Sequence, residues 1–126
     1  MKPNLALRII SIPSFIICCS IFIFKNFYLK EILFNVDLIE NKEMEYFINI
    51  CAICGINISI LIFNASRLIE ESARRMLKST GLIFGIMFIT LTITVITTAI
   101  RIPNYILFMT FIFGIFSYVS SRKTKN

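Results

Sequence analysis

The amino-acid sequence predicts an all-α, polytopic membrane protein in which four transmembrane helices form an antiparallel bundle. The 126-residue chain is 57% hydrophobic, with a mean hydropathy of +0.84 and only 16% charged residues, against about 25% in an ordinary soluble domain. A soluble domain of this length has too little interior to bury so much apolar surface. Disorder would require low hydrophobicity and high charge, which is the opposite composition.

The positions of the charged residues define the spans. Four long runs carry no charge, namely residues 9–24, 46–66, 79–100 and 102–121. A helix needs about 20 apolar residues to cross a bilayer, and its backbone must satisfy its own hydrogen bonds there. The runs are continuously apolar rather than alternating, which favours helices over strands. The expected spans, all in one domain of residues 1–126, are about 5–24, 46–65, 80–101 and 104–120.

The distribution of basic residues predicts the orientation. Four spans place both termini on one side, and nine of the 13 Lys and Arg residues fall on that side: Lys2, Arg8, Arg67, Arg74, Arg75, Lys78, Arg122, Lys123 and Lys125. The positive-inside rule then places both termini in the cytoplasm, in a cell (cytoplasmic) membrane. Residues 20–27 offer no small-x-small cleavage site, so we expect the first span to remain as an anchor.

Two segments outside the spans have helical patterns. Apolar residues recur at helical spacing in residues 28–36, which predicts a short helix in the outer interface or a loop that caps the bundle. In residues 66–79, Glu70 and Arg74 are four apart, as are Glu71 and Arg75, with the acid first. We interpret this segment as a helical extension of the second span followed by a short linker. A basic surface for anionic lipid or a partner is the alternative.

The composition excludes several classes of function. Without histidine the chain lacks the usual ligands of haem, zinc and copper and the base of Ser-His or Cys-His catalysis. All acidic residues lie outside the uncharged runs, so no span holds the buried carboxylate of a proton-coupled carrier. No Gly-rich phosphate loop is present. We therefore expect no metal, no cofactor, no catalytic residue and no nucleic-acid partner, with the lipid bilayer as the surroundings.

Small residues predict where the helices touch. Helices in lipid associate through close packing rather than through a hydrophobic driving force. Small residues share one face of each span, and Gly81 and Gly85 form a Gly-x-x-x-Gly motif. We expect helix packing at Gly55, Ser59, Gly81, Gly85 and Gly114. A dimer face is the other use for Gly81 and Gly85.

One asparagine stands apart from these faces. Asn57 lies near the middle of the second span, away from the small face of its helix. A lone amide in lipid is costly, so it requires an interhelical partner. We expect that partner in another helix, with a second copy of the chain as one source.

A polar stripe marks the third span. Thr90, Thr94, Thr97 and Arg101 fall on one side, roughly opposite Gly81. Threonine hydroxyls bond readily to carbonyls of their own helix, which is the role we expect. A polar interior path that ends at Arg101 is the alternative.

The cysteines suggest a second alternative function, in redox chemistry. Cys18, Cys19, Cys51 and Cys54 all lie in spans, and the last two form a Cys-x-x-Cys pair, a spacing used in thiol–disulfide exchange. In span number and in this pair, the chain resembles membrane oxidoreductases that pass electrons from thiols to quinone. Examples are the bacterial disulfide-bond oxidase and the vitamin K epoxide reductase family. The resemblance implies a redox role for Cys51 and Cys54, although those families also carry loop cysteines, which this chain lacks. We expect the cysteines to pack as small hydrophobes.

Together these features predict a small integral membrane protein without enzymatic activity. It would act through helix packing, either with itself as a homo-oligomer or as an accessory subunit of a larger membrane complex. Two alternatives stay open: a thiol–quinone oxidoreductase that uses Cys51 and Cys54, and a small uncoupled channel or carrier along the threonine stripe.

Overall fold

The computed structural model describes residues 1–32, 42–97 and 102–122, and all regular structure in this part of the chain is helical. The helices are α1 (Pro3–Ile23), α2 (Lys25–Ile32), α3 (Lys42–Ala65), α4 (Glu70–Thr97) and α5 (Asn104–Ser121). Four of these helices, α1, α3, α4 and α5, are long and apolar enough to cross a membrane. The prediction of four apolar helices is therefore confirmed.

The break between α3 and α4 lies where the sequence did not place it. α3 ends at Ala65, and residues 66–69 form a turn in which the Ser66 hydroxyl donates to the Phe63 carbonyl oxygen at 2.6 Å. Such a side-chain bond competes with continuation of the helix. The charged segment after the turn is the start of α4, so it extends the third span rather than the second. The prediction of an extension of the second span is wrong.

The first turns of α4 form a charged helical segment. The guanidinium of Arg74 donates to Glu70, and that of Arg75 donates to Glu71, each at 2.9 Å. These are the two pairs, four residues apart, that the sequence predicted to support a helix. The 28 residues of α4 correspond to about 42 Å. Because the hydrocarbon core is about 30 Å thick, α4 is long enough to span it and to project beyond it.

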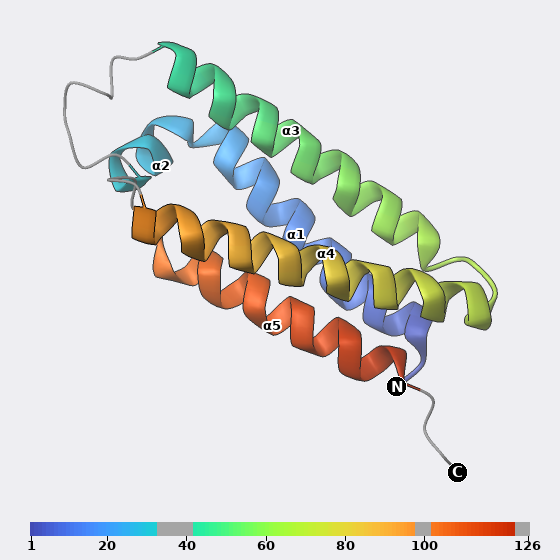
Figure 1. Cartoon of the computed structure of the whole chain (residues 1–126). Helices are drawn as coiled ribbons and strands as arrows, with labels where there is room; N and C mark the ends of the chain where they lie inside the picture. The colour runs from blue at the N-terminus through green and yellow to red at the C-terminus, as the bar shows by residue number, and fades with distance from the viewer. Residues whose placement is uncertain (33–41, 98–101, 123–126) are drawn as a thin grey trace.

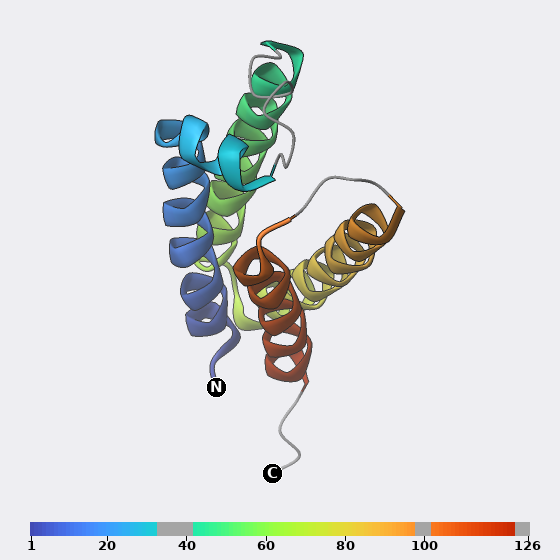
Figure 2. The same ribbon diagram turned by 90° about the vertical axis from the view of Figure 1, so that its left-hand side faces the viewer.

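The long helices pack as two pairs, α1 with α3 and α4 with α5 (Figure 1). The start of α1, the turn at residues 66–69 and the end of α5 lie at one end of the molecule, which we call the turn end. α2, the start of α3 and the end of α4 lie at the other end, the α2 end. Figure 2 shows that the two pairs meet toward the turn end, while the end of α4 stands apart from α1 and α3.

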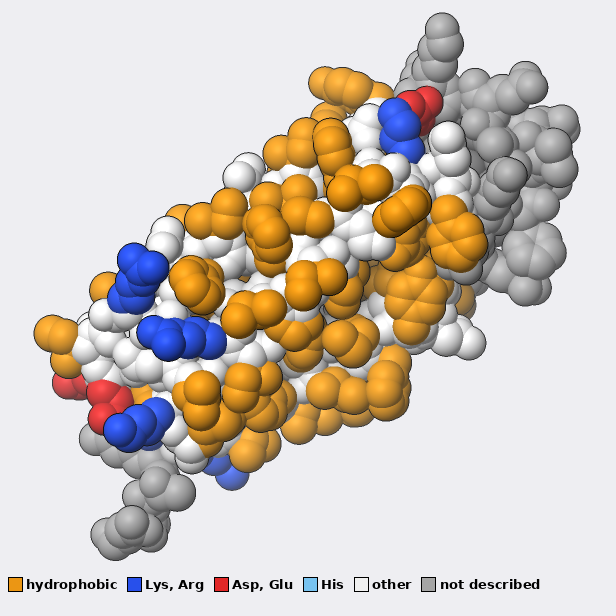
Figure 3. All heavy atoms as spheres, turned by 180° about the vertical axis from the view of Figure 1, so that it is seen from behind, with side chains coloured by type: hydrophobic (Ala, Val, Ile, Leu, Met, Phe, Trp, Pro, Cys, Tyr) orange, Lys and Arg blue, Asp and Glu red, His pale blue; other side chains and the backbone are white. Residues whose placement is uncertain are grey.

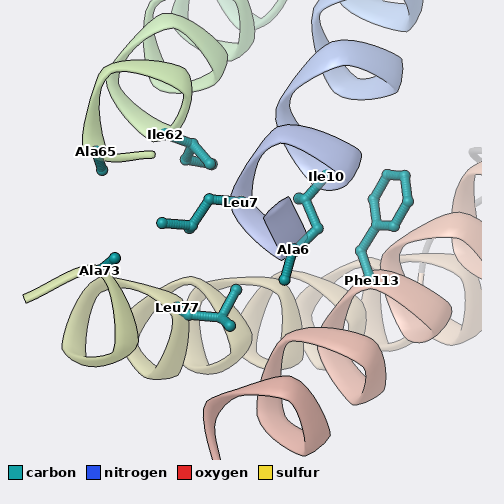
Figure 4. Packing of buried hydrophobic residues seen from close by; sticks show 8 residues of the cluster. All are labelled: Ala6, Leu7, Ile10, Ile62, Ala65, Ala73, Leu77 and Phe113. Atoms are coloured by element: carbon teal, nitrogen blue, oxygen red, sulfur yellow. The ribbon is translucent and has the colours of Figure 1, made fainter. Parts of the chain in front are cut away.

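The buried apolar residues gather toward the turn end (Figure 4). The cluster takes residues from all four long helices: Ala6, Leu7, Ile10, Ile62, Ala65, Ala73, Leu77 and Phe113. Leu7, Ile10 and Leu77 are completely buried. Close packing of these side chains stabilises the fold through many small dispersion contacts.

Polar contacts tie the first turn of α1 to the turn between α3 and α4. The Asn4 side-chain amide donates to the backbone oxygens of Ser66 and Leu68, both at 2.8 Å, and the Arg8 guanidinium donates to the Ser66 hydroxyl at 3.3 Å. The break in the helix leaves carbonyls without helical partners. Asn4 supplies two of those partners, so it joins the first helix pair to the start of the second.

Of the two alternatives for residues 28–36, the structure shows the helix for residues 28–32, as part of α2. α2 is fixed at both ends of its first turn, since Lys25 forms an ion pair with Glu45 of α3, and the hydroxyls of Tyr28 and Ser20 are 3.1 Å apart. The rest of the predicted segment, residues 33–36, lies outside the described residues.

Gly81 lies at a close approach of α4 and α5, whereas the side-chain direction of Gly85 is open. A Cβ atom built on Gly81 would lie 3.2 Å from Ser117 Cβ and from the Tyr118 backbone nitrogen, and a Cβ atom on Gly85 would meet no heavy atom within 4 Å. The sequence placed both glycines at the contact. Residues four apart in a helix differ by about 40° in direction, so α5 faces one and passes beside the other. Gly85 contacts α5 only through its backbone. Its backbone nitrogen lies 3.6 Å from a Cβ atom built on Gly114.

The pairing of α1 and α3 also involves small residues. A Cβ atom built on Gly55 would overlap the sulfur of Cys18 on α1. Ser59, one turn further along α3, is buried and donates its hydroxyl to the Gly55 carbonyl oxygen at 2.8 Å. The absence of a side chain at Gly55 thus makes room for Cys18.

We predict that Gly81→Leu destabilises the protein and that Gly85→Leu does not. Extra atoms at Gly81 would press on the α5 backbone, and such overpacking typically costs about 1–3 kcal/mol. The same substitution at Gly85 has the same change in volume and helix propensity but enters open space. The thermal unfolding midpoint and the folded yield in detergent measure the difference. Equal losses for the two variants would contradict the assigned contact.

Candidate functional site

The threonines of α4 bond to their own helix. The hydroxyls of Thr90, Thr94 and Thr97 each donate to the carbonyl oxygen four residues earlier, at 2.8–2.9 Å, which confirms the predicted back-bonding. Thr90 and Thr97 are exposed, and Thr94 is half-buried. In a single chain, Thr90 and Thr97 therefore border the surroundings rather than an interior path. Arg101, the predicted end of that path, lies outside the described residues.

The cysteines divide between two environments. All four lie among the described residues, and none is in a disulfide. Cys18 and Cys19 are half-buried, with Cys18 against Gly55, whereas Cys51 and Cys54 are exposed. Packing as small buried hydrophobes was therefore the wrong expectation for Cys51 and Cys54, because these residues point away from the side of α3 that contacts α1.

Asn57 lies in the middle of the exposed face of α3. The opposite face is buried through Ile48, Ala52, Ser59 and Ile62, and Asn57 itself is exposed. This confirms that Asn57 faces away from the small residues of its helix. Its amide takes part in no hydrogen bond among the residues that the structure describes.

The depth of Asn57 makes this exposure unusual. The apolar part of α3 runs over Glu45–Ala65, which places Asn57 about 18 Å from one end and about 12 Å from the other. An amide so far from both ends would lie in hydrocarbon, where an unsatisfied polar group costs several kcal/mol. In a membrane, Asn57 would therefore require a hydrogen-bonding partner that one copy of the chain does not supply among its described residues.

The neighbours of Asn57 form a continuous stripe. Exposed residues follow one another at alternating spacings of three and four, and we call them the α3 stripe: Phe47, Ile50, Cys54, Asn57, Leu61 and Asn64. This is the heptad spacing with which one helix packs along another. The stripe carries no charge, and Asn57 is its one polar amide away from the ends of the span.

Sequence analysis singled out Asn57 and Cys54 but not the stripe that contains them. The signal was present, since the three-and-four spacing can be counted in the sequence. It could not be separated from other apolar stripes until the structure showed which face of α3 is covered by α1.

Figure 3 shows one face of the molecule, where hydrophobic side chains cover the middle and charged ones lie toward the two ends.

The chemistry of the α3 stripe is that of association. A carboxamide both donates and accepts hydrogen bonds, so two copies of Asn57 are complementary to each other. Cys51 and Cys54 lie within the uncharged run 46–66, so no cation lies within one helical turn of either residue along α3 to stabilise a thiolate. Among the described residues, no group of His, Cys, Asp and Glu side chains is arranged to hold a metal ion.

Comparison of the chain with models of protein families, with curated proteins and with solved structures finds no match. The function is therefore inferred from the chain's own residues.

Proposed function

We propose that the chain is a non-enzymatic, multi-pass membrane protein whose four long helices form an antiparallel transmembrane bundle, and that it self-associates through the α3 stripe. The apolar character and length of α1, α3, α4 and α5 support the membrane location. The observation that carries the self-association is the exposed amide of Asn57, deep within an otherwise apolar stretch of α3.

Two copies related by a two-fold axis along the membrane normal would place one α3 stripe against the other. In such an interface each residue faces its own counterpart or a near neighbour. The two Asn57 amides then donate to and accept from each other, which removes the cost of exposing them to lipid. Each interhelical hydrogen bond in a membrane contributes about 0.6–1.7 kcal/mol. A polar residue at one heptad position also fixes the register of the two helices.

We further propose that the turn end faces the cytoplasm of a cell membrane. Among the described residues, this end carries Lys2, Arg8, Arg67, Arg74, Arg75, Lys78 and Arg122, against Glu70 and Glu71. Basic residues next to spans are retained on the cytoplasmic side.

The thiol–quinone oxidoreductase is the second candidate. Its support is the exposure of Cys51 and Cys54 on the outside of α3, where a quinone dissolved in lipid would reach them. The proposal ranks below self-association because no cysteine lies outside the spans to receive or deliver electrons at the membrane surface. The channel or carrier gains no support from Thr90 and Thr97, since both are exposed.

We predict that Cys54 forms a disulfide between two copies when native membranes are oxidised. A variant that keeps Cys54 as its only cysteine should give a covalent dimer, because Cys54 lies in the α3 stripe one turn from Asn57. A variant that keeps only Cys51 should give less, since Cys51 lies outside the stripe. Electrophoresis without reductant measures the covalent dimer. A cross-link to a protein of another mass would instead indicate an accessory subunit.

The variant that keeps Cys54 as its only cysteine also tests the role of the Asn57 amide. Asn57→Leu should lower the association constant of the dimer about three- to eighteenfold for each interhelical hydrogen bond lost, and the cross-linked fraction should fall with it. Asn64→Leu is the matched control, because Asn64 lies near the end of the span, where water can bond to its amide. Unchanged cross-linking in Asn57→Leu would contradict self-association through the α3 stripe.

We predict that both termini are cytoplasmic. Alkaline phosphatase requires disulfides, which form outside the reducing cytoplasm. A phosphatase fused after Asn126 should therefore be inactive, and one fused after residue 36 should be active. Phosphatase activity in the fusion after Asn126 would overturn the orientation.

We predict that Cys51 and Cys54 stay reduced in native membranes. Changing all four cysteines to alanine should leave the protein folded. The expected loss of stability is a few kcal/mol at most, because small packing cavities cost about 24 cal/mol per Å³ of cavity volume. Mass spectrometry of alkylated membranes checks the redox state. A Cys51–Cys54 disulfide that disappears when quinone is depleted would favour the oxidoreductase.

A further inference from the structure

An apolar groove runs along the outside of the α4–α5 pair. It has a volume of about 400 Å³, and three of its lining residues are the glycines Gly81, Gly85 and Gly114. The open direction of Gly85, where an added Cβ would meet nothing within 4 Å, keeps the groove hollow. The side chains along it are those of Leu82, Phe88, Ile89, Thr110, Phe111, Ile115 and Tyr118. We call this feature the α4–α5 groove.

The groove is basic where it reaches the turn end. Lys78 lines it there, next to Tyr118. The guanidinium of Arg122 donates to the Tyr118 hydroxyl at 3.3 Å and lies 4.9 Å from the centre of its ring. Two cations and a hydroxyl therefore gather at one mouth of the groove.

Neither cation has an acidic partner among the described residues. The nearby carboxylates in α4, Glu70 and Glu71, are paired with Arg74 and Arg75 at 2.9 Å. Lys78 and Arg122 form no ion pair in the described part of the chain. The mouth of the groove therefore offers uncompensated positive charge to an anion.

The length of the groove fits one leaflet. From Lys78 to Ile89 the helix advances by 11 residues, or about 16 Å, and half of the hydrocarbon core is about 15 Å. A ligand that fits this surface has an anionic group at the turn end and an apolar chain that reaches the middle of the membrane.

We propose that the α4–α5 groove binds one anionic phospholipid. An acyl chain lies along Gly81, Gly85 and Gly114, and the phosphate accepts hydrogen bonds from Lys78, Arg122 and the Tyr118 hydroxyl. Free phosphate would use the cations but not the groove. A second copy packed against the glycines would fill the groove but would leave the cations without an anion. The site is on a different helix pair from the α3 stripe and does not depend on self-association there.

The charge component is tested by native mass spectrometry of the full chain in detergent. Phosphatidylglycerol and phosphatidylcholine with the same acyl chains are added in equal amounts. Lys78→Gln and Arg122→Gln should each lower the preference for phosphatidylglycerol about fivefold. Arg75→Gln is the matched control, because it removes the same charge from the same end without touching the groove, and it should leave the preference unchanged. Equal losses in Lys78→Gln and Arg75→Gln would mean that the surface attracts anions without a site, and would overturn the proposal.

The groove component is tested by Gly85→Leu. The new side chain should occupy the open space and lower the retention of both lipids, while the thermal unfolding midpoint stays at the wild-type value. Unchanged lipid retention in this variant overturns the proposal. Loss of a dimer in Gly85→Leu, with lipid retention unchanged, would assign the groove to a second copy of the chain.

Discussion

The hydrogen bonds that Asn4 donates to the turn between α3 and α4 act together with the buried cluster to join the two helix pairs. Its amide reaches the carbonyl oxygens of Ser66 and Leu68, both at 2.8 Å, from the first turn of α1. The buried cluster around Leu7 and Leu77 lies beside this contact. Elsewhere, each pair is held mainly by its own helix contact. The position of α4, and with it the basic mouth of the α4–α5 groove, therefore depends on the polar and apolar contacts gathered at one end of the molecule.

The number of apolar helices could be predicted because charge is so expensive in hydrocarbon that it marks the limits of each span. The sequence could not predict whether the charged segment of residues 66–79 continues the second span or begins the third. Ser66 and Asn4 bond to each other's segments where α3 stops, and they are more than 60 residues apart in the sequence. Such a contact leaves no local pattern. The same limit applies to the glycines, since spacing predicts that Gly81 and Gly85 share a face but not which of them a neighbouring helix will approach.

The polar residues of the spans show how the sequence manages groups that lipid cannot solvate. The hydroxyls of Ser59, Thr90 and Thr97 return to carbonyls of their own helices, so they satisfy themselves locally on any face. An amide such as Asn57 has more donors and acceptors than its own helix can use. Spacing could therefore predict the role of the threonines, whereas the role of Asn57 depends on what lies outside the single chain. The interior of the protein serves packing, and the two outer faces carry the features on which the proposals of self-association and lipid binding rest.

The uninterrupted course of α4 has a mechanical consequence. Its charged first turns and its threonine-bearing last turns belong to one rod, and the rod is held chiefly at the turn end and against α5. Phe84 still packs against the buried cluster, and Met87 lines a pocket together with residues of α1. Beyond Met87, α4 continues for 10 residues to Thr97, or about 15 Å, and this end stands apart from α1 and α3 (Figure 2). A tilt of about 10° of this last part would displace its tip by about 3 Å. The first turns of α4 are held by the buried cluster, whereas its last turns have α5 as their main neighbour, so the two ends of one continuous helix differ in how firmly they are fixed.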